Sequence, residues 1–259
     1  MRILVTNDDG INAPGLQVLA DIARELSDDV WIVAPDTNQS GASHSLTLHE
    51  PLRCLEVADK TFSVKGTPTD CVIMGVRHIL LNAPPDLILS GVNRGSNIAE
   101  DVTYSGTVAG AMEGSLLGFR AIAFSQAIDY ERNEPIQWQT ARSYGPGIVR
   151  RLLDMDWNPS VLMNINFPPV MPDDVKGMMV TTQGKRDQSL LHIDERFDTW
   201  KQPYYWFNFE RRRSNPGEGT DLWALYNGLI SITPLTPNLT HLPAIEKLGG
   251  VMNGPASAT

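Results

Sequence analysis

Short apolar runs alternate along the chain with segments that have helical periodicity. The run at residues 3–5 is followed by apolar residues at helical spacing between Leu16 and Leu26, and a second run covers residues 30–33. Further strands are expected at residues 86–90, 121–125 and 161–166, and further helices from Pro68 (capped by Thr67), from the Ser105 region and over residues 138–153. This order predicts an α/β fold of the Rossmann-like, doubly wound type, with a mostly parallel sheet.

The pattern changes at two places. Residues 45–65 alternate between apolar and polar positions, which predicts short strands in an antiparallel extension. After residue 166 we expect a strand at 176–183, an aromatic-rich hairpin or arm at 188–215 and a last strand at 229–234. The sequence therefore predicts one domain over residues 1–240, with its core at about 1–170 and an arm and closing strands at about 176–240. It also predicts a flexible tail at 244–259.

Composition narrows the function. The 259 residues carry a net charge of −9, which argues against a duplex nucleic acid as partner, because such proteins need a basic face. Cys54 and Cys71 form no CxxC pair, and we expect both to be reduced in a cytoplasmic protein. No segment reaches the roughly 18 consecutive apolar residues of a membrane span, so we expect no membrane association.

The strongest candidate for chemistry is the acidic turn after the first strand. Asp8 and Asp9 follow the apolar run directly, at the sheet edge where α/β proteins bind ligands. Adjacent carboxylates repel each other unless a cation lies between them or one of them is protonated. A solvated acidic turn is the more common explanation for an arbitrary Asp-Asp pair, but the position of this pair favours a metal ion.

Two other loops leave the same predicted edge with oxygen ligands. Ser40 lies in the loop after the second strand, and Asn93 lies in the loop after the strand at 86–90. Carboxylate, hydroxyl and amide oxygens together suit Mg²⁺ or Mn²⁺. The five histidines show no zinc spacing, and His44 is of interest because it shares the Ser40 loop.

Ser105, Gly106 and Thr107 stand at the start of a predicted helix. Backbone N–H groups at a helix N-terminus favour an anion such as phosphate, although an ordinary N-cap is the more common role of such a sequence. The chain has no nucleophile-elbow glycine before Ser40, no dinucleotide fingerprint after the first strand and no Walker phosphate loop.

Several long motifs, in order, resemble the SurE family of stationary-phase survival proteins, which are metal-dependent 5′/3′-nucleotidases. The resemblance covers about residues 1–240. The motifs that carry it are residues 3–15, 34–41, 66–72, 90–97, 104–114, 219–221 and 231–235.

The resemblance implies a role for each matching residue. It implies one divalent ion, Mg²⁺ or Mn²⁺, bound by Asp8, Asp9, Ser40 and Asn93, and a phosphate held by Asn97, Ser105, Gly106 and Thr107. It also implies a C-terminal extension that is exchanged in a homodimer or homotetramer.

We therefore expect a phosphatase that hydrolyses nucleoside 5′- and 3′-monophosphates to nucleoside and phosphate. Asp8 or Asp9 would take the proton from the attacking water, and Asp9 is preferred. A receiver-like regulatory domain is the main alternative, but the phosphoacceptor Asp and the late Lys are missing after residues 86–89 and 121–124. A haloacid-dehalogenase-type phosphatase would place its nucleophile at Asn7, which forms no aspartyl phosphate.

Overall fold

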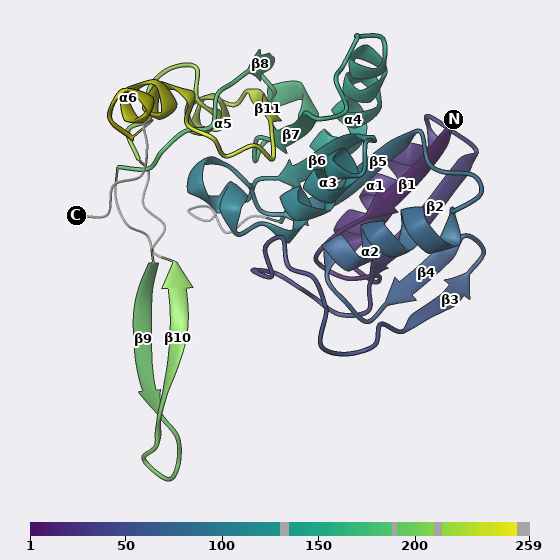
Figure 1. Cartoon of the computed structure of the whole chain (residues 1–259), viewed down its shortest axis with the longest axis horizontal. Coiled ribbons are helices and arrows are strands. Elements are labelled where there is room, and N and C mark those ends of the chain that lie inside the picture. Colours follow the sequence, from purple (N-terminus) through teal and green to yellow (C-terminus); the bar gives the residue numbers. More distant parts are fainter. Residues whose placement is uncertain (130–134, 188–190, 210–213, 253–259) are drawn as a thin grey trace.

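The computed structural model describes residues 1–129, 135–187, 191–209 and 214–252. A nine-stranded sheet forms its centre, in the order β3-β4-β2-β1-β5-β6-β7-β11-β8 (Figure 1). The strands are β1 (Arg2–Thr6), β2 (Asp29–Pro35), β3 (Cys54–Ala58), β4 (Thr61–Val64), β5 (Leu87–Arg94), β6 (Arg120–Gln126), β7 (Leu162–Phe167), β8 (Met178–Val180) and β11 (Ile230–Leu235).

The six strands from β4 to β7 in this order are parallel to their neighbours, whereas β3 is antiparallel to β4 and β11 is antiparallel to β7. The predicted mostly parallel sheet is therefore confirmed. The extension expected at residues 45–65 forms β3 and β4, of which only β3 runs antiparallel. The strand expected at 176–183 is shorter than predicted, since β8 contains three residues and is paired with β11.

Helices cover both faces of the sheet. The helices are α1 (Pro14–Arg24), α2 (Pro68–Met74), α3 (Gly106–Leu116), α4 (Trp138–Leu153), α5 (Asp221–Tyr226) and α6 (Leu242–Met252). Ile3 and Val5 point into a core shared with α1 and α4, while Leu4 points into a second core shared with α2 and α3. Strands buried on both faces explain why their sequences are continuous apolar runs.

Local signals set the helix boundaries. Thr67 caps α2 as predicted: its hydroxyl accepts from the Asp70 N–H, and the Asp70 carboxylate accepts from the Thr67 N–H. The apolar spacing of Val72, Val76 and Leu80 predicts a helix that continues to Leu80, but α2 ends at Met74 and a π-helical turn, Gly75–Ile79, follows. None of the helices in the described ranges has the length and apolar character needed to cross a membrane.

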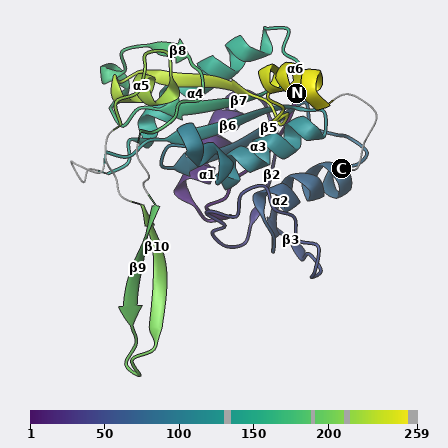
Figure 2. The same cartoon turned by 60° about the vertical axis from the view of Figure 1, so that its left-hand side comes forward.

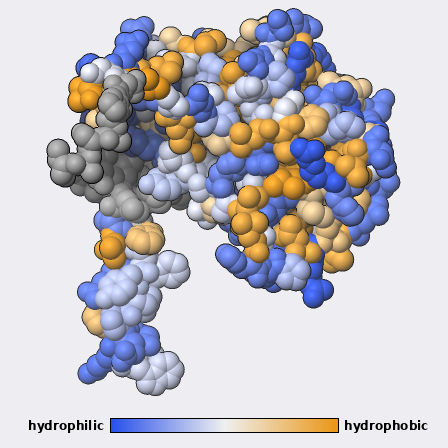
Figure 3. Space-filling model, viewed as in Figure 1, coloured by the Kyte–Doolittle hydropathy of each residue, from blue (hydrophilic) through white to orange (hydrophobic). Residues whose placement is uncertain are grey.

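The predicted arm is a β-hairpin that projects away from the body (Figures 1 and 2). Its strands are β9 (Leu191–Phe197) and β10 (Pro203–Phe209), which form a separate two-stranded antiparallel sheet. The space-filling view also shows the hairpin standing clear of the body (Figure 3). The predicted tail includes α6 as far as Met252, and residues 253–259 lie outside the described part of the chain.

Candidate metal and phosphate site

The acidic turn lies at the carboxyl end of β1, between the ends of β2 and β5. Asn7 closes the turn, because its side-chain amide donates to the Gly10 carbonyl oxygen at 2.9 Å. The loops that follow β1, β2 and β5 leave the same edge of the sheet, since these strands are parallel neighbours. The predicted convergence of these loops is therefore what the topology produces.

Asp8 lies directly against the start of α3. The Thr107 hydroxyl donates to Oδ1 of Asp8 at 2.5 Å, and Asp8 is only 4% exposed. A Cβ atom at Gly106 would lie 2.7 Å from the Cβ of Asp8, so glycine is required for this approach. Thr107, expected as a phosphate ligand, thus uses its hydroxyl to orient a carboxylate.

Burial makes the charged form of both carboxylates unfavourable. It raises the pKa of Asp8 to about 6, to which repulsion by Asp9 contributes, although the Thr107 hydrogen bond opposes the shift. Burial also raises the pKa of Asp9, although the hydrogen bond from the Arg94 N–H and the positive charge of the Arg94 side chain oppose this shift. No Lys, Arg or His in the described ranges forms an ion pair with either carboxylate.

Main-chain contacts bring the Ser40 loop against the acidic turn. The Gln39 N–H donates to the Asp8 carbonyl oxygen at 2.7 Å, and the Asn38 amide lies 3.4 Å from Oδ1 of Asp9. Ser40 itself is exposed, and its N–H donates to Oδ1 of Asn38 at 2.8 Å. The loop therefore lies beside Asp8 and Asp9, with the Ser40 side chain open to solvent.

The Asn93 loop reaches the same turn from the other side. The Arg94 N–H donates to Oδ2 of Asp9 at 3.2 Å. The side-chain amide nitrogen of Asn93 donates to the Gly95 carbonyl oxygen at 2.9 Å, and the amide oxygen takes no part in this bond. The Asn93 loop therefore contacts Asp9 through a backbone N–H group, as the predicted convergence of the loops requires.

Asn97 and Ser105 have structural partners of their own. The Asn97 amide donates to Oγ of Ser125 at 2.8 Å, and its backbone N–H donates to Oδ1 of Asn166 at 2.8 Å. Ser105 is the N-cap of α3, because its hydroxyl accepts from the Val108 N–H at 3.0 Å. As an acceptor in this cap, the Ser105 hydroxyl keeps its hydrogen for another partner.

His44 does not join the acidic turn. Its Nε2 lies 2.9 Å from a carboxylate oxygen of Glu113, on α3. Across the described ranges, no group of three or more His, Cys, Asp and Glu side chains is arranged to hold a metal ion. A cation at the acidic turn would therefore need hydroxyl or amide ligands besides the two carboxylates.

A cavity of about 450 Å³ opens beside Asp9. Its lining includes Asn12, Asp36, Arg94 and Trp138, the first residue of α4. Sequence reasoning missed Arg94 and Trp138. The position of Trp138 at the start of a helix after the β6 loop, at the carboxyl edge of the sheet, is the signal that would have indicated it.

The site has the properties of a divalent-cation site next to an anion site. Neither of the two adjacent carboxylates forms an ion pair with a described Lys, Arg or His, and the buried Oδ1 of Asn7 in the same turn has no hydrogen-bond partner among the described residues. Oxygen ligands of this kind fit Mg²⁺ or Mn²⁺. The start of α3 supplies N–H groups for an anion beside that position.

Comparison with known proteins identifies the family. Residues 3–190 match the family described as "Survival protein SurE". A protein of Methylobacterium nodulans named 5′-nucleotidase SurE is 57% identical over 251 residues, covering 97% of this chain and 99% of its own. One of Caulobacter vibrioides with the same name is 54% identical over 255 residues, covering 98% and 97%.

The fold agrees with this similarity. The crystal structure of the SurE protein from Aquifex aeolicus matches with a TM-score of 0.84 and 38% sequence identity, covering 98% of this chain and 100% of that one. The acidic turn and the start of α3 lie within the matched residues 3–190. The chain therefore belongs to the SurE family.

Proposed function

We propose that this chain is a divalent-metal-dependent 5′-nucleotidase that hydrolyses nucleoside monophosphates to nucleoside and inorganic phosphate. The observation that supports this most directly is the Asp8–Asp9 pair, in which Asp8 packs against the start of α3. The relatives at 54–57% identity that carry the name 5′-nucleotidase support the same reaction. Activity on 3′-monophosphates is part of the proposal.

The proposed metal ligands are Asp8, Asp9, Ser40 and Asn93, and the ion is Mg²⁺ or Mn²⁺. When bound, such an ion supplies Lewis-acid polarisation of a phosphoryl oxygen. Thr107 keeps Oδ1 of Asp8 in a fixed direction, and Asn38 and the Arg94 N–H do the same for Asp9. Because these contacts already hold both carboxylates in place, less side-chain freedom would be lost when the ion binds.

The phosphate is assigned to the N-terminus of α3 and to Asn97. The N–H groups of Gly106 and Thr107 and the hydroxyl of Ser105 would donate to the phosphoryl oxygens as charge spreads over them. Asp9 borders the open cavity whereas Asp8 is buried, so Asp9 is the carboxylate that water reaches. It would accept the water proton as the new P–O bond forms and the ester P–O bond breaks, and that proton would then pass to the leaving nucleoside oxygen.

The cavity beside Asp9 is the proposed place for the nucleoside. Trp138 offers an aromatic face on which a base can stack, and Asn12 and Asn38 offer hydrogen-bonding groups near the ribose. A volume of about 450 Å³ is in the range of sites that bind small molecules.

The assembly is proposed to be a homodimer or homotetramer in which the hairpin contacts a partner subunit. Ile193, Phe197, Tyr205 and Phe207 share one largely apolar face of the hairpin, in which Glu195 is the charged member, and each of the four is 60% exposed or more. Such an apolar face is unfavourable in water and is typical of an interface. Because Cys54 and Cys71 are both free thiols, a reducing, cytoplasmic location is also proposed.

Phosphate release from a panel of ribonucleoside 5′- and 3′-monophosphates tests the function. The chain should release phosphate with Mn²⁺ or Mg²⁺ and lose that activity in excess EDTA. Asp8→Asn should abolish release. Turnover that survives both the chelator and the substitution would contradict the proposal.

A further inference from the structure

The turn between Asn97 and Ser105 has an unfavourable backbone conformation. It contains a 3-10 helix, Ala99–Thr103, and its first residue, Ala99, has a φ angle of 51°. This left-handed conformation is unfavourable for a residue with a Cβ and persists where surrounding contacts hold it. The turn therefore needs partners outside its own sequence.

Asp221 is one of these partners, although it lies 122 residues away. Its carboxylate is fully buried at the start of α5. Oδ2 accepts from the Ala99 N–H at 2.9 Å, while Oδ1 accepts from the N–H groups of Gly184 at 2.8 Å and Leu222 at 2.7 Å. A Cβ at Gly184 would lie 2.7 Å from Oδ1 of Asp221, so glycine is needed at that position.

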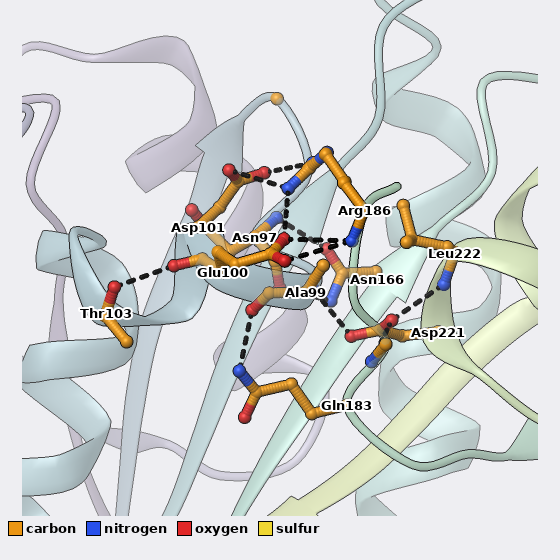
Figure 4. Close-up of polar contacts among 12 residues, drawn as sticks. Asn97, Ala99, Glu100, Asp101, Thr103, Asn166, Gln183, Arg186, Asp221 and Leu222 are labelled. Atoms are coloured by element: carbon orange, nitrogen blue, oxygen red, sulfur yellow. Dashed lines mark hydrogen bonds and ion pairs between the residues drawn. The ribbon is translucent and has the colours of Figure 1, made fainter. Parts of the chain in front are cut away.

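Two further side chains complete the clamp on this turn (Figure 4). The Gln183 amide donates to the Ala99 carbonyl oxygen at 2.9 Å. Arg186 donates to both carboxylate oxygens of Asp101, at 2.6 and 3.0 Å, and to Glu100 at 3.3 Å. We call Gln183, Arg186 and Asp221 the C-terminal clamp.

The two ends of the turn are fixed by the sheet. At one end, the Asn97 backbone is bound by the side chains of Asn164 and Asn166 on β7. At the other end, Thr107 is bound to Asp8. The C-terminal clamp binds residues 99–101 between these two ends. Contacts from outside the turn therefore hold it at three places between Asn97 and the start of α3.

Apolar packing alone would not give this precision. Ile98 and Ala99 lie in a small cluster with Leu222 and Leu225, which attracts the turn to α5 without fixing its direction. Burying a carboxylate is costly, and burial raises the pKa of Asp221 even though three N–H groups oppose the shift. The buried Asp221 carboxylate, which fixes hydrogen bonds in defined directions, thus indicates that the orientation of the 97–105 turn is important.

We propose that Asp221 is a positioning residue of the phosphate site: through Ala99 it holds the 97–105 turn so that Asn97 and the start of α3 face one phosphoryl group. This inference rests on the proposed function, because it assigns a role within that same site. Gln183 and Arg186 assist by holding the same turn. Asp221 itself contacts neither the metal ligands nor Ser105 and Thr107.

Asp221→Asn removes one contact of the clamp selectively. The amide oxygen can still accept from Gly184 and Leu222, whereas the amide nitrogen then faces the Ala99 N–H, which is a donor as well. We expect the dissociation constant of inorganic phosphate for the Mn²⁺-loaded protein to rise about tenfold, because small displacements of positioning groups weaken a site strongly. The Michaelis constant for AMP should rise in parallel.

Two other readouts separate positioning from general stability. The affinity for Mn²⁺ should stay within twofold, since the four proposed ligands are untouched. Amide hydrogen exchange in a peptide covering residues 97–107 should become faster in the variant.

Asp29→Asn is the matched control. Asp29 makes ion pairs with Arg2 and Lys60 at the opposite, amino-terminal edge of the sheet. The control should lower the melting temperature while phosphate affinity and exchange at 97–107 remain unchanged.

Gln183→Met is a milder variant for the case in which Asp221→Asn does not fold. It removes the bond to the Ala99 carbonyl oxygen and retains side-chain length. A threefold rise in the phosphate dissociation constant is expected.

If the folded variants keep wild-type phosphate affinity and exchange rates, the inference is wrong and Asp221 has only a structural role. If wild-type protein releases no phosphate from any nucleotide, the proposed function fails. The phosphate titration and the exchange measurement still decide the role of Asp221 in that case.

Discussion

The Thr107 hydroxyl donates a hydrogen bond of 2.5 Å to Oδ1 of Asp8, and this bond joins the start of α3 to the turn after β1. Thr107→Val keeps the shape of the side chain but removes the donor. We expect Mn²⁺ affinity to fall about tenfold, because partners that orient a ligand contribute that much or more. Titration calorimetry measures the effect. Thr107→Ser should restore most of the affinity, and equal affinities for the Val and Ser variants would contradict this role.

Asp8→Asn should stabilise the metal-free protein at neutral pH. Folding raises the pKa of Asp8 from an ordinary value of 3.8 to about 6. The ionised Asp8 carboxylate therefore lowers the free energy of unfolding of the wild type above pH 6, and this destabilisation disappears as the pH falls towards 4. The difference corresponds to roughly 3 kcal/mol at pH 7. Urea denaturation in EDTA at pH 7 and pH 4 checks it. Added Mn²⁺ should stabilise the wild type and leave the variant unchanged. A variant that is less stable than wild type at pH 7 would disprove the expectation.

Trp138→Leu should separate nucleoside binding from phosphate chemistry. If the base stacks on the indole in the cavity, its loss costs about 1–3 kcal/mol, or at least a fivefold rise in the Michaelis constant for AMP. p-Nitrophenyl phosphate has no nucleoside and serves as the internal control, with an unchanged Michaelis constant. Equal effects on both substrates would place the nucleoside elsewhere.

Asp29→Asn should change how stability depends on pH. The Lys60 hydrogen bond, together with Trp31 and Arg2, lowers the pKa of Asp29 to about 2. A lowered pKa gives stability that is present at pH 7 and is lost as the pH falls from about 4 to 2. Since one third of the side chain is exposed, solvent screening limits the loss at pH 7 to about 1 kcal/mol. Thermal melts of wild type and variant should converge at pH 2, and a constant difference would argue against the assignment.

Two substitutions on neighbouring hairpin residues test the assembly. Phe207 lies on the apolar face with Ile193, whereas Trp206 lies on the opposite face beside Asp194. Phe207→Ser should shift sedimentation velocity profiles towards the monomer, because it removes buried apolar area from the interface. Trp206→Ser is the matched control and should shift them less. A monomeric wild type would contradict a hairpin-mediated assembly.

The core of the fold could be predicted because its elements are set by local patterns. Residues 3–5 form a strand that is buried on both faces, residues 30–33 form its partly buried neighbour, and Thr67 and Ser105 cap their helices through contacts three residues away. The parallel sheet then brings Asp8, the Ser40 loop and the Asn93 loop to one edge. These predictions needed only short-range information and a known topology.

Other features depend on contacts between distant residues. The Asp221–Ala99 bond joins residues in different parts of the chain, and no local pattern in residues 97–105 indicates it. β8 is only as long as its pairing with the first three residues of β11, Ile230–Ile232, and the break of α2 at Gly75 places that glycine against Leu4 of β1. The cavity beside Asp9 similarly requires α4 to be placed next to the acidic turn.

A hydrogen bond joins the two chain segments that lead into and out of the hairpin. The Asn215 N–H donates to Oδ2 of Asp187 at 3.1 Å, so the chain on the two sides of the hairpin meets at the surface of the body. A segment whose ends already touch can change length at little entropic expense to the domain that carries it. The hairpin is thus an appendage that evolution or protein engineering can shorten, extend or exchange without re-pairing any strand of the nine-stranded sheet.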